Sequence, residues 1–195
     1  MSDRIIITGN IGSGKSKVTE IFSDNGYMVI SADEISAKIL KRYQQEISKM
    51  FSIRPMMFDS FKTELGQMVF TDDTVKYALE DFMLPKINGE IDFTTELFDI
   101  QNTKYVVEMP TFFETRGLRN HEGVIIINVV ADKAVRIKRI MNRNKHLSIQ
   151  DVLDRMGAQL APDLKRRWSF VTIDNSGNVK TLERKVENFI KLMNS

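Results

Sequence analysis

Thr8-Gly9-Asn10-Ile11-Gly12-Ser13-Gly14-Lys15-Ser16 decides the fold, because it joins a short β-branched run to a helical pattern. It satisfies the motif G-x-x-x-x-G-K-[ST] without a gap. The glycines let the backbone turn so that successive N–H groups point at one anion. The helix that follows adds the positive end of its dipole at the same place. We therefore predict a nucleotide-phosphate site between a buried strand and the first helix.

Two side chains of this loop have predicted chemical roles. Lys15 reaches the β- and γ-phosphates, and the hydroxyl of Ser16 ligates the Mg²⁺ that accompanies them. The alternative is a glycine-rich turn with a chance lysine, which the flanking strand and helix disfavour. The predicted nucleotide-binding residues of the loop are Asn10, Ile11, Gly12, Ser13, Gly14, Lys15, Ser16 and Lys17.

The length and composition of the chain limit its domain organisation, its partners and its chemistry. A chain of 195 residues fits one domain, with room for inserted subdomains. Its 28 basic and 26 acidic residues leave a net charge of +2, so no global field favours nucleic acid or a membrane. The absence of cysteine excludes disulfides and thiol chemistry. The sequence enters a strand directly and has no apolar run of membrane-spanning length, so we expect a cytoplasmic protein with small-molecule substrates.

The second predicted strand, residues 27–30, ends at Ser31-Ala32-Asp33. We expect this strand to lie next to the P-loop strand, with Asp33 at the carboxyl edge of the sheet, where open α/β sheets bind ligands. Two interpretations of Asp33 remain open. It caps the helix that follows, or its carboxylate faces the γ-phosphate and accepts a proton from an acceptor hydroxyl.

Residues 34–100 follow a helical pattern almost throughout, with apolar residues at helical spacing up to Leu84-Pro85. This stretch is too long for an ordinary crossover between strands. We therefore predict a helical insertion, residues 34–102, that holds an acceptor substrate beside the phosphate site. The core of the domain then comprises residues 1–33, 103–131 and 168–195, and residues 132–167 form a lid.

Three further strands complete the predicted sheet. The first, residues 104–109, brings Glu108 to a strand end, where it can hold a Mg²⁺-bound water, and residues 111–114 loop over the site. Residues 124–130 are the most apolar, as expected of a central strand in a parallel sheet. The last strand, residues 170–173, leads through Asp174-Asn175-Ser176-Gly177 into a closing amphipathic helix.

A basic helical segment, residues 132–145, follows the most apolar strand. Arg136, Arg139 and Arg143 are three and four residues apart, so they share one helix face. A run of charges is usually a solvated face, but in a nucleotide-binding protein this position favours a lid that clamps phosphates. Arginine suits that role because its planar fork binds phosphate oxygens bidentately. Ser148 then begins a further helix, which we expect to contain Arg155 and Gln159.

With these residues assembled, the chain resembles the dephospho-CoA kinase family of P-loop kinases nearly from end to end. The P-loop is close to the family's T-G-G-I-G-S-G-K-S, and Ser31-Ala32-Asp33 stands where the family has D-A-D. Residues 65–70 look like L-G-x-x-V-F, and residues 108–114 look like D-I-P-L-L-F-E. The later matches are Arg139 and Arg143 for R-x-x-x-R, then Arg155, Gln159 and Lys165 at family spacing, and Asn175-Ser176-Gly177 near N-x-G.

The resemblance implies a P-loop NTPase fold of three layers, α/β/α, with a five-stranded parallel sheet, a helical CoA-binding domain and a helical lid. It also implies transfer of the γ-phosphate of ATP, with Mg²⁺, to the ribose 3′-hydroxyl of dephospho-CoA. Carried onto this sequence, it gives Asp33, Lys15 and Arg139 as catalytic residues and Arg139, Arg143 and Asn175 as further nucleotide ligands. The implied acceptor-binding residues are Asp33, Lys62, Leu65, Pro110, Glu114 and Arg155, and the implied metal ligands are Ser16 and Glu108.

Several residues depart from the family pattern. Ser31, Glu108 and Phe170 each replace an aspartate, Ala37 (beside Lys38) replaces an arginine, Phe61-Lys62 replaces D-R, and Leu84 replaces a histidine. Most of these positions belong to the acceptor side, so a changed acceptor stays open, since a site discriminates through its polar contacts. One alternative is a nucleoside or deoxynucleoside monophosphate kinase. Another is a P-loop regulatory protein without transfer, which the retained Lys15, Ser16, Asp33 and lid arginines argue against.

Overall fold

The computed structural model describes residues 4–114 and 123–194 and is centred on a five-stranded sheet in the order β2-β3-β1-β4-β5. All four strand pairings are parallel, so the predicted α/β class with a five-stranded parallel sheet is confirmed. The strands are β1 (Arg4–Thr8), β2 (Met28–Ser31), β3 (Tyr105–Glu108), β4 (Val124–Val130) and β5 (Val171–Asp174).

The strand that precedes the P-loop is the middle strand of the sheet. Ile7 of β1 pairs with Glu108 of β3 on one side and with Ile127 of β4 on the other. Ile7 and Ile127 are completely buried, as expected of β-branched residues in a parallel sheet covered on both faces. β4, the strand predicted to be central, is paired on both sides, with β1 and β5.

The prediction that the strand leading to Asp33 lies next to the P-loop strand is wrong. β3 lies between them, and its Glu108 is in register with Ser31 of β2 as well as with Ile7 of β1. β3 is buried along most of its length, whereas Met28 and Val29 of β2 are 50% and 38% exposed. The more exposed strand therefore takes the edge of the sheet, where a strand needs only one neighbour.

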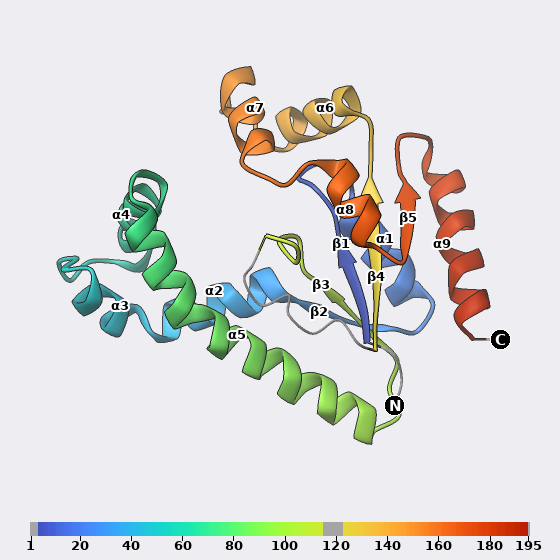
Figure 1. Cartoon of the computed structure of the whole chain (residues 1–195), viewed down its shortest axis with the longest axis horizontal. Helices are drawn as coiled ribbons and strands as arrows, with labels where there is room; N and C mark the ends of the chain where they lie inside the picture. Colours follow the sequence, from blue (N-terminus) through green and yellow to red (C-terminus); the bar gives the residue numbers. More distant parts are fainter. Residues whose placement is uncertain (1–3, 115–122, 195) are drawn as a thin grey trace. The chain divides into compact units, whose positions relative to one another are not determined.

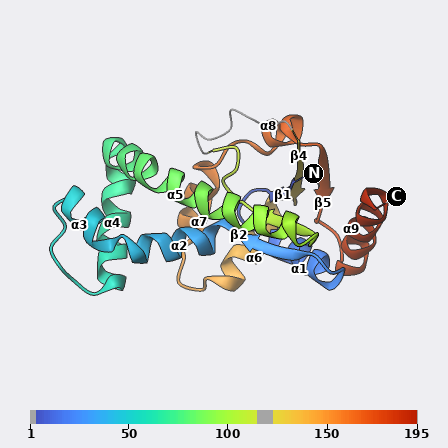
Figure 2. The ribbon, with the colours of Figure 1, turned by 90° about the horizontal axis from the view of Figure 1, so that it is seen from below.

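Helices cover both faces of this sheet. α1 (Lys15–Asp24) and α9 (Val179–Met193) pack on one face and bury Val18, Phe22 and Val186 against the strands. α8 (Pro162–Trp168) lies on the opposite face (Figure 2). α6 (Lys133–Arg143) and α7 (Ile149–Gly157) lie beyond the carboxyl ends of β1 and β4 (Figure 1). This arrangement places α6 and α7 at the edge of the sheet from which the P-loop emerges.

A second compact unit comprises Ala32–Glu96, and the remainder of the described chain forms the first. The second unit is built from α2 (Ala32–Arg42), α3 (Gln44–Met50), α4 (Phe58–Thr71) and most of α5 (Asp73–Ile100). The helical pattern seen in the sequence between residues 34 and 100 is thus found in the structure. The unit has its own apolar core, made by Ile39, Ile47, Ile53, Phe61, Leu65 and Met83.

α5 continues through Pro85, the position up to which apolar residues follow helical spacing in the sequence. Proline lacks the backbone N–H that would bond the carbonyl four residues earlier, so Asp81 loses its helical partner. Apolar residues on both sides of Pro85 hold the helix together, because Met83 and Ile91 are buried. Pro85 itself is exposed.

Replacing Pro85 should therefore stabilise the protein. Pro85→Ala restores the missing N–H in an exposed helix position, and proline costs about 3 kcal/mol relative to alanine inside a helix. Because proline also restricts the unfolded chain, we expect a net gain of about 1–2 kcal/mol in the free energy of unfolding, measured by urea titration. Gly89→Ala, also in α5 with open space around its Cα, is the matched control and should gain about 0.5–1 kcal/mol. A loss of stability in Pro85→Ala would mean that α5 is interrupted at this residue.

Candidate functional site

The P-loop joins β1 to α1 and depends on glycine for two reasons. Gly9, Gly12 and Gly14 have φ of 146°, 77° and 90°, which side chains rarely allow. A Cβ on Gly9 would lie 2.2 Å from the carbonyl oxygen of Val129, and one on Gly14 would lie 2.1 Å from Nδ2 of Asn175. The loop therefore turns where neighbouring segments approach too closely for any side chain.

Lys15 lies inside this loop. Its side chain is buried, and Nζ donates hydrogen bonds to the carbonyl oxygens of Gly9 at 2.9 Å and Asn10 at 3.4 Å. The hydroxyl of Ser13 is also buried and has no hydrogen-bond partner within the described chain. An ammonium group and an unpaired hydroxyl in one turn of backbone fit a phosphate ligand.

The next two residues lie in the first turn of α1 and differ in exposure. Ser16 is exposed, so its hydroxyl is accessible to a metal ion. Lys17 forms an ion pair with Glu20 at 2.8 Å along the helix, and this hydrogen bond raises the pKa of Lys17. The side chain of Lys17 thus points along α1, and its backbone N–H donates to the carbonyl oxygen of Gly14 at 3.1 Å.

Arg139 and Asn175, both predicted to bind nucleotide, meet at the P-loop. Nη1 of Arg139 donates to the carbonyl oxygen of Ser13 at 3.2 Å, and Nη2 donates to that of Asn175 at 2.9 Å. Nδ2 of Asn175 donates to the same Ser13 oxygen at 2.8 Å. These contacts bring α6 and the turn after β5 onto the loop, so the structure places both residues at the candidate site.

Ile11 is held through both of its backbone groups by residues that the predicted site did not include. Nε of Arg136 donates to the Ile11 carbonyl oxygen at 2.9 Å, and the Ile11 N–H donates to Oε1 of Gln159 at 2.7 Å. Nδ2 of Asn10 donates to the carbonyl oxygen of Leu160 at 2.9 Å. The expected helix containing Gln159 ends earlier, because α7 stops at Gly157, and this leaves Gln159 in a connection that reaches the P-loop.

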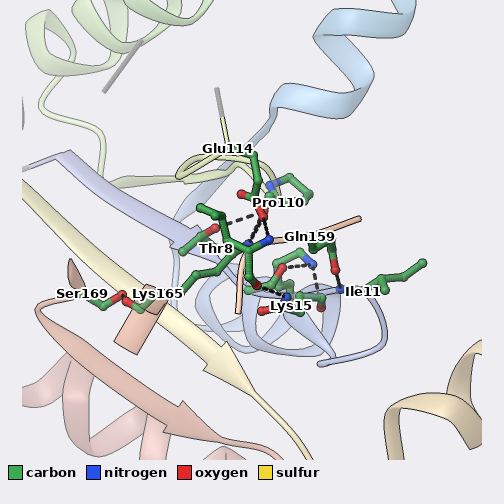
Figure 3. A network of polar contacts seen from close by, with 11 residues as sticks. Thr8, Ile11, Lys15, Pro110, Glu114, Gln159, Lys165 and Ser169 are labelled. Atoms are coloured by element: carbon green, nitrogen blue, oxygen red, sulfur yellow. Dashed lines mark hydrogen bonds and ion pairs between the residues drawn. The ribbon is translucent and has the colours of Figure 1, made fainter. Parts of the chain in front are cut away.

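A second polar network lies behind the loop (Figure 3). Lys165 is completely buried in α8, and its Nζ lies 2.6 Å from Oε1 of Glu114 and 3.4 Å from the carbonyl oxygen of Pro110. Thr8, the last residue of β1, donates from Oγ1 to the same Pro110 oxygen at 3.2 Å. The backbone N–H of Leu160 donates to Glu114 at 3.3 Å. Pro110 and Glu114, predicted to bind the acceptor, are thus fixed beside the end of β1.

The remaining predicted residues of the first unit lie at the ends or on the surfaces of their elements. Glu108 is half-buried at the carboxyl end of β3, in the register row of Ile7 and Ser31. Arg143 is the last residue of α6, and Arg155 lies in α7; both are exposed. The hydrogen bonds that join α6 to the P-loop come from Arg136 and Arg139.

The predicted residues of the second unit have different environments. Leu65 is buried in the apolar core, so its side chain packs within the unit, whereas Lys62 of α4 is exposed. Asp33 is exposed in the first turn of α2, which begins at Ala32. The N-cap interpretation of Asp33 is therefore wrong in this structure, because the residue is itself helical. A carboxylate in a first turn still interacts favourably with the helix dipole.

The candidate site offers few protein oxygens that could bind Mg²⁺. Within residues 4–114 and 123–194, no group of three histidine or acidic side chains is placed to hold a metal ion. Mg²⁺ in kinases takes one or two protein oxygens, and water and substrate phosphates supply the rest. The exposed hydroxyl of Ser16 and the carboxylate of Glu108 fit that need.

Breaking the Lys165–Glu114 pair should destabilise the protein more than removing both of its partners does. Lys165→Met leaves the Glu114 carboxylate without its cation, and breaking a buried pair costs about 3–5 kcal/mol of unfolding free energy. The double variant Lys165→Met/Glu114→Leu should recover most of this loss. Lys185→Met breaks a 3.9 Å pair with Asp174 between exposed side chains, and it should cost about 1 kcal/mol at most. Urea titration measures the free energy of unfolding of all three variants. Equal losses in Lys165→Met and Lys185→Met would contradict the prediction.

Known proteins that are similar to this chain include several that match it over nearly its whole length. The family model described as dephospho-CoA kinase matches residues 4–181. A dephospho-CoA kinase of Helicobacter pylori is 30% identical over 194 residues, which cover 99% of this chain and 98% of that protein. The crystal structure of TT1252 from Thermus thermophilus is 29% identical with a TM-score of 0.82, covering 98% of each chain. The dephospho-CoA kinase structure from Campylobacter jejuni is 28% identical with a TM-score of 0.74, covering 98% of this chain and 96% of that one. The chain therefore belongs to the dephospho-CoA kinase family.

Proposed function

We propose that this chain transfers the γ-phosphoryl group of ATP to the ribose 3′-hydroxyl of dephospho-CoA, which yields coenzyme A and ADP. The observation that carries the proposal is the family match over residues 4–181, which includes both the P-loop unit and the whole helical unit. The P-loop geometry supports the phosphate-donor half of the reaction. One turn of backbone holds the three glycines, the buried Lys15 and the unpaired hydroxyl of Ser13, and this combination fits a phosphate ligand.

On the donor side, Lys15 leaves the carbonyls of its own loop and binds the β- and γ-phosphates. Backbone N–H groups of the loop bind the phosphates, except those of Ile11, Ser13 and Lys17, which already donate within the protein. Arg139 and Asn175 already contact the loop and bind beside them. Arg143 joins when residues 132–167 close as a lid. Ser16 would ligate Mg²⁺ and Glu108 would hold one of its waters, and the ion would supply positive charge next to the transferred group.

On the acceptor side, residues 34–102 form the helical domain that holds dephospho-CoA. Lys62 and Arg155 are exposed cations suited to its phosphates. Leu65 contributes through the core of that domain. Pro110 and Glu114, which Lys165 holds in the first unit, are the further acceptor contacts that we propose. Asp33 accepts the proton of the attacking 3′-hydroxyl as the phosphoryl group transfers.

A nucleoside monophosphate kinase and a regulatory P-loop protein are the alternatives, and a coupled ADP-release assay separates them from the proposal. The purified protein is given Mg²⁺–ATP with dephospho-CoA, AMP, dAMP or CMP in turn. Dephospho-CoA should give turnover at least a hundredfold above any monophosphate. Preferred turnover of a monophosphate would favour the first alternative, and nucleotide binding without acceptor-dependent ADP release would favour the second. No helix of the described chain is long and apolar enough to cross a membrane.

Lys15→Ala should abolish transfer without unfolding the protein. The lysine serves the phosphates, and losing one charge-assisted donor in a desolvated site costs about 3 kcal/mol or more of transition-state stabilisation. We expect turnover to fall by at least about a hundredfold, while the melting temperature without nucleotide shifts by only a few degrees. Near-normal turnover in folded Lys15→Ala would contradict the phosphate-site assignment.

Asp33→Asn should separate catalysis from folding. Asparagine keeps the size of the side chain and loses the base, so turnover should fall by about 10²- to 10⁴-fold with ATP affinity little changed. Glu34→Gln is the matched control, because Glu34 is also an exposed acid in the first turn of α2. Both variants lose one favourable dipole interaction of about 0.3–1 kcal/mol, and only Asp33→Asn should lower turnover strongly. If Asp33→Asn kept a third of wild-type turnover on dephospho-CoA, Asp33 would not be the base.

A further inference from the structure

Arg136 is a buried cation beneath the P-loop. Only 6% of the residue is exposed, and Nε is anchored on the carbonyl oxygen of Ile11 at 2.9 Å. Its Nη2 is buried without a hydrogen-bond partner in the described chain. Burial lowers the pKa of the guanidinium, and no carboxylate of the described residues forms an ion pair with it. A buried charge is costly unless an opposite charge compensates it.

The position of Arg136 is set by backbone packing as well as by this hydrogen bond. A Cβ on Gly12 would lie 2.8 Å from the carbonyl oxygen of Arg136 and 3.1 Å from its Cα. The α6 backbone therefore lies directly against the P-loop, and the guanidinium reaches the peptide just before Gly12. Gln159 binds the other side of the same Ile11 residue, so the loop cannot shift away from Arg136 without losing both contacts.

We propose that Arg136 is a positioning residue that acts through the P-loop, because it is anchored on the Ile11 carbonyl. The phosphates of the bound nucleotide compensate its buried charge. Arg136 attracts these phosphates electrostatically and does not contact them. Coulomb energy falls only inversely with distance, and partial burial weakens the screening by water. Arg136 differs in this from Arg139, whose fork reaches the loop at Ser13 and the turn at Asn175. The inference rests on the proposed use of ATP at this loop.

Two side-chain replacements separate this role from a purely structural one. Arg136→Lys keeps the charge and a donor, whereas Arg136→Met keeps the apolar stem and loses the charge. If Arg136 only supported the fold, Arg136→Met would lower the melting temperature and leave nucleotide affinity unchanged. If bound phosphates compensate the charge of Arg136, Arg136→Met weakens nucleotide binding. The melting temperature without nucleotide then falls little, because the substitution also removes an uncompensated buried charge.

The test is titration calorimetry of the full chain with Mg²⁺–ADP, together with thermal melting without nucleotide. Arg136→Met should bind at least tenfold more weakly than wild type, and Arg136→Lys should bind within threefold of it. Lys138→Met, an exposed position on the same helix, is the control for a general loss of positive charge and should bind as wild type does. If Arg136→Met does not fold, Arg136→Gln replaces it, because glutamine keeps a donor for Ile11 and lacks the charge; it should bind at least fivefold more weakly than Arg136→Lys.

Binding by Arg136→Met within threefold of wild type would overturn the proposal, as would an Arg136→Lys variant as weak as Arg136→Met. The same series distinguishes this failure from failure of the proposed function. If the wild-type chain does not bind Mg²⁺–ADP, the nucleotide assignment is wrong, and this inference is wrong with it. If wild type binds and all the variants bind equally well, only the role of Arg136 is wrong.

Discussion

The close approach of three chain segments to the glycines of the P-loop is the constraint on which the rest of the first unit depends. The Val129 carbonyl meets Gly9, the α6 backbone meets Gly12, and the Asn175 amide meets Gly14, each closer than any Cβ permits. These contacts place β4, α6 and the turn after β5 around one loop at the carboxyl edge of the sheet. The polar groups that converge there, from Lys15 to Arg139, follow from this packing.

The sequence predicts best what depends on residues close together in the chain. The loop motif, its strand and its helix are local, and each β-branched run became a strand within a residue or two of its expected bounds. The order of the strands is not local, and here the expectation failed. β2 and β1 are consecutive in the sequence, yet β3 separates them, because consecutive strands are neighbours only as a tendency. Family resemblance, rather than pattern, indicated that Arg139 and Asn175 belong to one site.

The predicted site omitted several residues because the sequence does not show which side chains become buried or where a helix ends. Periodicity does not reveal which member of a basic segment is buried, and the structure buries Arg136 of α6 and Lys165 of α8. Gln159 belongs to the site because α7 ends two residues before it, a boundary that the sequence placed later. At Pro85 the helical pattern predicted for residues 34–100 is found in the structure, because buried neighbours hold α5 together across a residue that disfavours a helix. The acceptor-side assignments of Lys62, Leu65 and Asp33 stay proposals.

The clamped peptide at Ile11 has a consequence for how the protein folds. The loop precedes its partners in the chain, and its hydrogen bonds run to residues 125, 148 and 162 positions further along. Contacts of such sequence separation form slowly, because long loops of chain must close before the contacts can form. The phosphate-binding loop of a growing chain therefore cannot reach its final shape until residues beyond Asn175 have left the ribosome. The loop therefore gains its nucleotide-binding shape late in folding, after these distant segments have come together.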